Sequence, residues 1–136
     1  MSHTFHLRIY EADGVFYEGE AELVVIPTVD GEFGVMAHHE NMVVSIIPGM
    51  LKYRIAEEEL RIASVSSGMM RVENNDVLVL VASAERPEEI DEARATEEER
   101  AAKEAMLQKR SLQEYILAEA TLQRAVNRLK VKNRNK

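Results

Sequence analysis

Residues 86–95 have the sequence RPEEIDEARA, and the pattern of the chain changes within this stretch. Proline suits the first turn of a helix, where its missing N–H donor is not needed. Acidic side chains crowd the turn that follows, where the helix dipole favours negative charge. The stretch therefore predicts a boundary at residue 86, with one domain over residues 1–86 and a helical domain over residues 87–136.

Upstream of this boundary, short apolar runs are separated by turn residues. Phe5, Leu7 and Ile9 alternate with polar neighbours, which is the two-residue period of a strand with one solvated face. Residues 23–26 form a β-branched run that is expected to stop at Pro27. The main turn signals are Asp13-Gly14, Asp30-Gly31, Pro48-Gly49, Ser67-Gly68 and Asn74-Asn75-Asp76. Short strands at this spacing predict a small antiparallel sandwich or barrel.

Downstream of the boundary, the pattern predicts two helices joined by a short connection at residues 110–113. In the second helix, apolar side chains recur at spacings of three and four: Tyr115, Ala118, Leu122, Ala125 and Leu129. The apolar face of the first helix is expected to consist of small side chains and one methionine: Ala93, Ala101, Ala102, Ala105 and Met106. Because alanine removes little area from water, this helical hairpin is predicted to be weakly closed and mobile. The whole chain is predicted to have an α+β fold.

The composition is that of a globular chain with an aliphatic core. The 136 residues are 46% apolar and 30% charged, but only 5% are aromatic, and cysteine is absent. Without cysteine, disulfides, thiolate metal sites and a cysteine nucleophile are excluded. No apolar run approaches the ~18 residues of a transmembrane helix, and the first residues do not resemble a signal peptide. We therefore expect neither a membrane span nor direct insertion into lipid.

The formal net charge of −7 is unevenly distributed along the sequence. Residues 1–86 hold 6 basic and 14 acidic side chains, a net charge of −8, which disfavours binding to nucleic acid. Residues 121–136 hold 6 basic side chains and no acidic one. The basic side chains of this tail include Arg124, Arg128, Lys130, Lys132 and Arg134. Such a tail suits an acidic protein surface or the phosphates of a nucleotide.

Candidate catalytic and metal-binding groups are few. His38-His39-Glu40 is a cluster of metal-ligating side chains, but adjacent residues of a strand point to opposite faces, and no second cluster offers a third ligand. The serines at positions 64, 66 and 67 have neither a positioned base nor the spacing of a nucleophile elbow. We expect no metal site, no required cofactor and no catalytic activity from this chain alone.

A cluster of arginines is the strongest candidate for binding. Arg124 and Arg128 lie four residues apart, and in an antiparallel hairpin the end of the second helix lies beside the start of the first. Their guanidinium groups and that of Arg94 are therefore expected to converge near Asp91. One interpretation is a solvated basic face. The other is a site where arginine forks bind phosphates and the carboxylate accepts a hydrogen bond from a ribose hydroxyl or an amino group.

Five short motifs occur in a specific order along the chain. They are GEFGVM at residues 31–36 followed by His39, Pro48-Gly49-Met50, Ser67-Gly68, IDEARA at residues 90–95 and RAVNRL at residues 124–129. In this order and spacing they resemble the epsilon subunit of bacterial F-type ATP synthases, over nearly the whole length of the chain. The resemblance implies a ten-stranded N-terminal β-sandwich, a C-terminal α-helical hairpin and a non-catalytic role in the rotor.

The same resemblance implies partners and a location. The sandwich is expected to bind the γ subunit and the ring of c subunits, with c-ring contacts at Gly31, Glu32, Phe33 and His39. The hairpin, extended along γ, is expected to place its basic tail against the α and β subunits and to inhibit ATP hydrolysis, whereas the folded hairpin permits turnover. The expected location is the cytoplasmic face of the bacterial cell membrane, as a peripheral part of the complex.

Some members of this family bind ATP in the folded hairpin. By position, the resemblance assigns this role to Ile90, Asp91, Arg94, Ala95, Arg124 and Arg128. Three positions depart from the family pattern. His38 replaces a common glycine, Ser67 stands beside Gly68 where a pair of glycines is expected, and Ala101 stands where ATP-binding relatives have a further arginine. ATP is then a regulatory ligand. Two alternatives are a free-standing soluble ATP-binding sensor and a β-sandwich adaptor, and copurification with γ distinguishes both from a rotor subunit.

Overall fold

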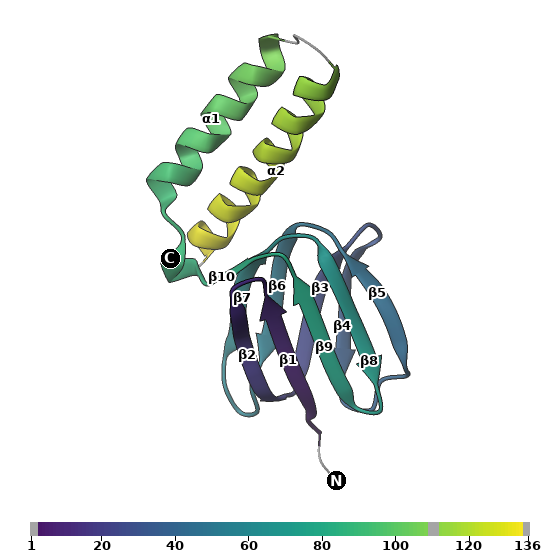
Figure 1. The fold of residues 1–136 in the computed structure, drawn as a ribbon. Coiled ribbons are helices and arrows are strands. Elements are labelled where there is room, and N and C mark those ends of the chain that lie inside the picture. Colours follow the sequence, from purple (N-terminus) through teal and green to yellow (C-terminus); the bar gives the residue numbers. More distant parts are fainter. Residues whose placement is uncertain (1–2, 109–111, 135–136) are drawn as a thin grey trace. The chain divides into compact units, whose positions relative to one another are not determined.

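The chain folds into a unit of strands and a unit of helices (Figure 1). The computed structural model describes residues 3–108 and 112–134. Residues 1–85 form the first compact unit and residues 86–136 the second. The predicted α+β fold, a β-sandwich followed by a helical hairpin, is thereby confirmed.

Ten strands form two five-stranded sheets. The first sheet has the order β2-β1-β9-β8-β5 and the second has the order β10-β7-β6-β3-β4. In chain order the strands are β1 (Phe5–Glu11), β2 (Gly14–Ala21), β3 (Leu23–Thr28), β4 (Gly31–Met36), β5 (Met42–Ile46), β6 (Gly49–Arg54), β7 (Leu60–Val65), β8 (Gly68–Glu73), β9 (Asp76–Val81) and β10 (Ala84–Glu85). The expectation of a purely antiparallel arrangement is wrong at one place, because β1 and β9 pair in parallel. The first and the last long strands meet there at the centre of one sheet.

The tight turns form where the sequence predicts them. Thr28 pairs with Gly31 across the β3–β4 hairpin, and Gly31 has a φ of 110°, a conformation that glycine adopts without strain. The Thr28 hydroxyl donates to the Gly31 carbonyl at 2.7 Å and accepts from the Asp30 N–H at 3.2 Å. At the β8–β9 hairpin, Asn74 and Asn75 both have positive φ, as a two-residue primed turn requires.

Pro27 does not end its strand, contrary to the expectation from the sequence. β3 continues to Thr28, and Pro27 pairs with Glu32 of β4. The pairing of β3 with β6 ends at Val25, so the proline lies beyond that ladder, where a missing N–H donor costs nothing on that side. The Pro27 carbonyl instead accepts a hydrogen bond from the Ile47 N–H at 3.1 Å.

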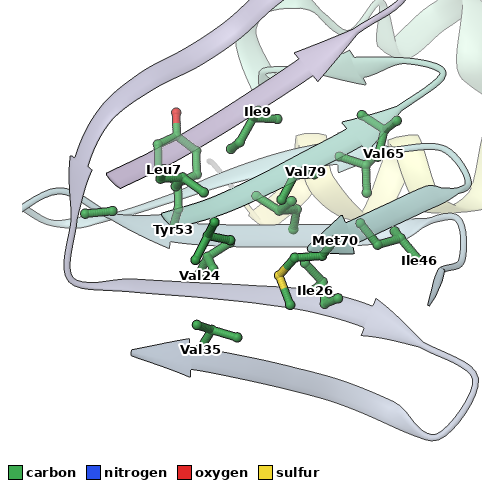
Figure 2. Close-up of a cluster of buried hydrophobic side chains, with 14 of the residues drawn as sticks. Leu7, Ile9, Val24, Ile26, Val35, Ile46, Tyr53, Val65, Met70 and Val79 are labelled. Atoms are coloured by element: carbon green, nitrogen blue, oxygen red, sulfur yellow. The ribbon is translucent and has the colours of Figure 1, made fainter. Parts of the chain in front are cut away.

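The core is an aliphatic cluster between the inner faces of the two sheets (Figure 2). Leu7, Ile9, Val24, Ile26 and Met70 are fully buried. Tyr53 adds the main aromatic contacts, with its ring centroid 5.1 Å from that of Tyr17 and 6.4 Å from that of Phe16. Such a close-packed cluster makes the sandwich the rigid part of the chain.

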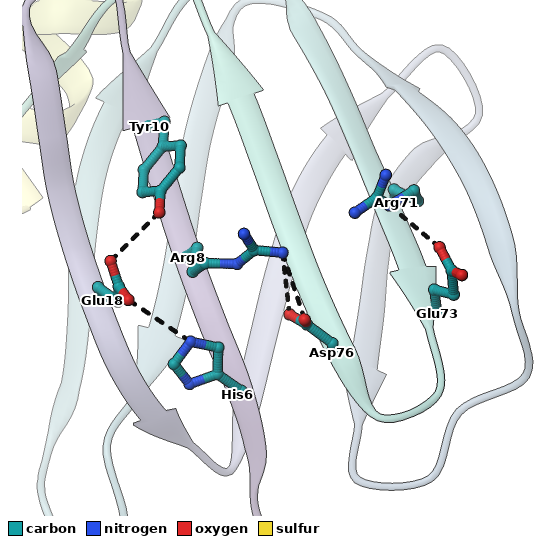
Figure 3. A network of polar contacts seen from close by, with 7 residues as sticks. All are labelled: His6, Arg8, Tyr10, Glu18, Arg71, Glu73 and Asp76. Carbon is teal, nitrogen blue, oxygen red and sulfur yellow. Dashed lines mark hydrogen bonds and ion pairs between the residues drawn. The ribbon is translucent and has the colours of Figure 1, made fainter.

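The outer face of the first sheet carries a network of polar side chains (Figure 3) beside the exposed apolar side chains of Val43, Met69 and Leu80. Arg8 donates to both carboxylate oxygens of Asp76 at 3.2 and 3.4 Å, which ties β1 to its parallel neighbour β9. Glu18 accepts from the Tyr10 hydroxyl at 3.2 Å and lies 3.7 Å from the His6 imidazole. Solvated pairs of this kind contribute at most about 1 kcal/mol each, so the apolar core remains the main source of stability.

The first α-helix begins later than the sequence predicts. Pro87 opens a 3-10 turn, η1 (Pro87–Glu89), and the backbone is extended at Ile90 before α1 (Glu92–Gln108) begins. The second helix, α2 (Leu112–Arg134), already includes residues 112 and 113 of the predicted connection. The rest of that connection, residues 110 and 111, lies outside the described residues. Over its described residues, neither helix is long and apolar enough to cross a membrane.

Alanines form the contact between the two helices. Among the helix side chains that the structure describes, the buried ones are Ala95, Ala102, Ala118, Ala125 and Val131. The alanines lie seven residues apart within each helix, a spacing that keeps them on one face. The predicted face is wrong in part, because Ala93, Ala101 and Ala105 are exposed. At 100° per residue, Ala101 and Ala105 lie roughly 80–120° around the helix from Ala95.

Gly68 is expected to tolerate no side chain. A Cβ atom at this position would overlap the Leu80 carbonyl oxygen and lie 2.8 Å from Val81 Cα, both in the backbone of β9. We predict that Gly68→Ala lowers the free energy of unfolding by roughly 1–3 kcal/mol, because the strands must separate. Urea unfolding of the full chain, followed by tyrosine fluorescence, measures this.

Gly34→Ala is the matched control, because the nearest atom to a Cβ there is Val25 Cγ2 at 3.8 Å. This substitution is expected to leave stability unchanged or to raise it by up to about 1 kcal/mol, since alanine loses less backbone entropy than glycine. Equal effects of the two substitutions would contradict the packing argument.

Candidate functional site

Asp91 is the N-terminal cap of α1. Its side-chain Oδ1 accepts a hydrogen bond from the Arg94 N–H at 3.1 Å, and its carbonyl accepts from the Ala95 N–H at 2.9 Å. The first N–H groups of a helix have no partner within the helix, and an aspartate at this position supplies one. The Asp91 carboxylate is therefore held at the start of the helix by the backbone and not by a guanidinium group.

Glu98 joins the two helices through a pair of arginines. One carboxylate oxygen, Oε1, lies 3.4 Å from Nε of Arg94 on the same helix, and the other, Oε2, accepts from Nη1 of Arg128 on α2 at 3.2 Å. The Arg128 side chain is only 18% exposed, whereas that of Arg94 is 74% exposed. The guanidiniums expected near Asp91 thus meet on Glu98 instead, and two of the three take part.

Arg124 does not join this arrangement. Its Nη2 lies 3.5 Å from the Thr121 hydroxyl one turn earlier, and it forms no ion pair with any residue that the structure describes. One turn beyond Arg128, Lys132 is half-buried and donates to the Pro87 carbonyl at 3.3 Å. The predicted basic tail therefore divides into two sets. Arg128 and Lys132 close the hairpin, and the exposed members are Arg124, Lys130 and Arg134.

Two apolar residues of the predicted ATP site are buried. Ile90, whose backbone is extended before α1, is 3% exposed, and Ala95 is fully buried on the face that packs against α2. The Ile90 N–H donates to the Pro87 carbonyl at 3.2 Å. With both side chains buried, the exposed groups of the predicted site are polar ones.

Arg100 is held by carboxylates of its own helix. It donates to Glu97 on one side and to Glu104 on the other, at distances between 2.6 and 3.1 Å. The hydrogen bonds and charge of Arg100 lower the pKa of Glu97 below its usual value. The next residue, at the position where ATP-binding relatives are expected to have an arginine, is Ala101, and its side chain is exposed.

The residues expected to contact the c-ring lie along and beside an edge strand. Gly31, Glu32 and Phe33 belong to β4, at the edge of the second sheet. Glu32 accepts from the Lys52 ammonium at 3.0 Å. The His39 ring in the β4–β5 loop lies 5.7 Å from the Phe33 ring in an edge-to-face contact. The structure thus brings Phe33 and His39 together.

The loop that carries His39 is fixed by Asn75. The Asn75 side-chain oxygen accepts from the His38 N–H at 2.7 Å, and its amide nitrogen donates to the Thr4 carbonyl at 3.0 Å. His38 has a φ of 63°, in the left-handed region that favours glycine. The glycine that the resemblance leads us to expect at this position would adopt this conformation without strain. Within residues 3–108 and 112–134, no group of side chains has the geometry of a metal site.

Two features of the hairpin site were not identified from the sequence. Asp91 was interpreted as a partner for guanidinium groups, although an aspartate before a run of helix formers also predicts a cap. The sequence pattern does not distinguish Glu98 from its acidic neighbours Glu97 and Glu99. Its position four residues after Arg94 is nevertheless the spacing of a helical ion pair. The resulting site combines two closely placed guanidiniums, one carboxylate between them and further exposed cations, which is suited to binding an anion.

Two family models together match nearly the whole chain. Residues 4–87 match the model described as ATP synthase, Delta/Epsilon chain, beta-sandwich domain. Residues 88–133 match the model described as ATP synthase, Delta/Epsilon chain, long alpha-helix domain. The boundary between the two matches lies in the stretch where the sequence pattern changes.

Curated relatives share more than a third of the residues. The chain is 39% identical to the ATP synthase epsilon chain of Caldanaerobacter subterraneus over 96% of this chain and 95% of the relative. It is 40% identical to the ATP synthase epsilon chain of Shouchella clausii over 94% of each chain. The fold is also similar to a chain in the structure of the mitochondrial ATP synthase of Euglena gracilis, with a TM-score of 0.82, 23% identity and coverage of 90% of this chain and 78% of that chain.

The cap at Asp91 generates a prediction. Asp91→Ala is expected to destabilise the first turn of α1 by about 1 kcal/mol, because the Arg94 N–H loses its acceptor. Asp91→Asn keeps an acceptor oxygen and is expected to destabilise the turn by only about a few tenths of a kcal/mol, since the two residues cap helices about equally well. Amide hydrogen exchange at Arg94, measured by NMR, should be faster in the alanine variant only. Equal exchange in both variants would mean that the cap is unimportant.

Proposed function

The chain belongs to the Delta/Epsilon chain family of ATP synthase and is a non-catalytic subunit of that membrane-associated complex; from this premise we propose that it works in the central stalk, as part of the rotor, and regulates ATP hydrolysis through its helical hairpin. The sandwich is the part that binds the γ subunit and rests on the c-ring. The complex lies at the cytoplasmic face of the bacterial cell membrane.

The rigidity of the sandwich supports a role in transmitting rotation. A subunit that carries torque between partners must not deform, and the interlocked aliphatic core provides this. Gly31, Glu32, Phe33 and His39 are the proposed c-ring contacts. Their local structure is well fixed, because the hairpin turn is hydrogen-bonded and Glu32 is bound to Lys52, whose side chain is 14% exposed.

The alanine contact between the helices is the observation that carries the regulatory proposal. Each buried methyl group contributes about 0.8 kcal/mol, against roughly 1.5–3 kcal/mol for a fully buried leucine, so closure of the hairpin gains little from apolar burial. Opening therefore costs little, and a partner can supply the cost. We propose that the hairpin extends along γ toward the α and β subunits and blocks hydrolysis in that form.

Exposed apolar side chains near the far end of the hairpin support an extended form with its own contacts. Leu107 is 81% exposed, Ile116 57% and Leu117 69%. Large apolar side chains that stay exposed together often mark surfaces that bind a partner. In the extended form these side chains and the exposed cations Arg124, Lys130 and Arg134 are available to the catalytic head, which is proposed to hold complementary carboxylates.

ATP is proposed to favour the folded form. The proposed ligands are Ile90, Asp91, Arg94, Ala95, Arg124 and Arg128. A ligand that binds only the folded form stabilises it by RT ln(1 + [ATP]/Kd), and a ligand with equal affinity for both forms shifts nothing. Falling ATP would then release the extended, inhibitory form. Arg124 supports this proposal, because its side chain is exposed and its contact within the described part of the chain is a long one, 3.5 Å to the Thr121 hydroxyl.

Deletion of residues 88–136 tests the inhibitory role. In the reconstituted ATP synthase, we expect ATP hydrolysis to rise several-fold, because the element that blocks the head is gone. The truncated chain should still copurify with γ, since the sandwich has its own core. Unchanged hydrolysis would contradict inhibition by the hairpin. Loss of copurification would contradict the placement in the rotor and favour an adaptor or a free-standing sensor.

Calorimetric titration of the full chain with ATP tests the sensing role. We expect heat of binding for the wild type and a loss of at least tenfold in affinity for Arg94→Ala and Arg124→Ala, since each removes a positive charge from the phosphate site. Asp91→Asn is the appropriate aspartate variant, because it preserves the helix cap while removing the charge. Lys103→Ala, on the same helix and paired with Glu99, is the control and should bind normally. Absence of binding at millimolar ATP would contradict the proposal.

A further inference from the structure

We propose that Glu98 is an internal anion that occupies the arginine site of the folded hairpin, so that a polyphosphate ligand must displace its carboxylate in order to bind. The inference rests on the proposed binding of ATP in the hairpin and concerns the regulation of that site. It assigns Glu98 two effects, which are to hold the hairpin closed when no ligand is bound and to weaken the binding of any phosphate.

The first argument is geometric. The two carboxylate oxygens of Glu98 contact Arg94 and Arg128 separately, at 3.4 and 3.2 Å, as two oxygens of one phosphate would. Arginine forks bind carboxylates and phosphates with the same planar set of donors. A phosphate that binds both guanidiniums must therefore compete with Glu98 for them.

The second argument concerns the neighbouring carboxylates. Glu97 pairs with Arg100 and Glu99 pairs with Lys103, both within α1. Asp91 accepts from the backbone at the start of the helix. Glu98, by contrast, pairs with Arg128 of α2 as well as with Arg94 of its own helix. Because Glu97 and Glu99 pair with other cations, competition for these two arginines is assigned to Glu98.

The third argument is the exposure of the three side chains. Glu98 is 35% exposed, so its carboxylate can leave the arginines and turn into solvent without becoming a buried, unpaired charge. Arg128 is only 18% exposed, so an anion beside its guanidinium is poorly screened by solvent. Exchange of the Glu98 carboxylate for a phosphate keeps an anion at this position.

Glu98→Gln tests the proposal, because it keeps the size of the side chain and removes its charge. We expect the full-length variant to bind sodium tripolyphosphate and ATP about tenfold more tightly than the wild type in calorimetric titrations. Glu97→Gln removes the same charge one residue away and is the control, with an affinity within about twofold of the wild type. Tripolyphosphate and ATP are compared because competition with Glu98 should act on the phosphates and affect both ligands equally.

The same variant has a second readout. Without ligand, Glu98→Gln should lower the thermal midpoint of the helical circular dichroism signal, because Arg128 loses its ion pair, and saturating tripolyphosphate should restore it.

Tighter binding of tripolyphosphate and ATP by Glu98→Gln than by the wild type supports the proposal. If the variant binds but the wild type binds too weakly to detect, the competition is supported and only ATP sensing by the natural chain is contradicted. If the wild type binds ATP and the variant binds equally or less tightly, the competition is wrong and ATP sensing stands. If neither chain binds tripolyphosphate or ATP at millimolar concentration, both proposals are overturned.

Discussion

The helical hairpin is closed mainly by small side chains, and this constraint governs how the molecule can work. Four of the five buried helix side chains that the structure describes are alanines, Ala95 and Ala102 on α1 and Ala118 and Ala125 on α2, and the fifth is Val131. The sandwich has the opposite character, because large side chains such as Leu7, Ile9, Ile26 and Met70 are fully buried in its core. One chain therefore combines a part whose packing resists deformation with a part whose packing contributes little to staying closed.

A weak apolar contact gives polar contacts unusual weight. In a hairpin held by leucines, one half-exposed ion pair would hardly matter, since such pairs contribute about 1 kcal/mol or less. Here the pair of Glu98 with Arg128 and the hydrogen bond of Lys132 to the Pro87 carbonyl are comparable with the contribution of each alanine. The balance between closed and open forms of the hairpin is therefore sensitive to charge. An ionic ligand or an acidic partner surface can shift this balance for that reason.

The sequence predicts the sandwich better than the hairpin, for physical reasons. Turns such as Asp30-Gly31 depend on local backbone preferences, and the alternation around Leu7 depends on the strand period, so both can be inferred from neighbouring residues. The parallel pairing of β1 with β9 joins residues about seventy positions apart, and nothing local specifies it. Pro27 is tolerated because β6 has ceased to pair with β3 at that point, which is also a property of the whole sheet.

In the hairpin, the errors have a common cause. The residues Asp91, Arg94, Arg124 and Arg128 were identified as a charged cluster, but partners were assigned by sequence spacing alone. The backbone takes Asp91 as a cap, because α1 begins at Glu92 and not at Pro87. Ala93 is exposed because it lies roughly 160° around the helix from the buried Ala95. The position of Arg128 beside Glu98 depends on how the two helices align, which neither helix determines by itself.

Competition between an internal carboxylate and a ligand limits how strongly the ligand can act. If Glu98 must leave before a phosphate binds, then the free energy of its ion pairs is subtracted from that of binding, and the folded form gains only the difference. Glu98 would then hold part of the population folded without ligand, and falling ATP would shift the balance toward the extended form. Because the competition raises the apparent Kd, the response moves to higher ATP concentrations, which suits a regulator exposed to an abundant ligand. Removing the charge of Glu98 would make the same hairpin a tighter binder but leave its folded form more dependent on the ligand.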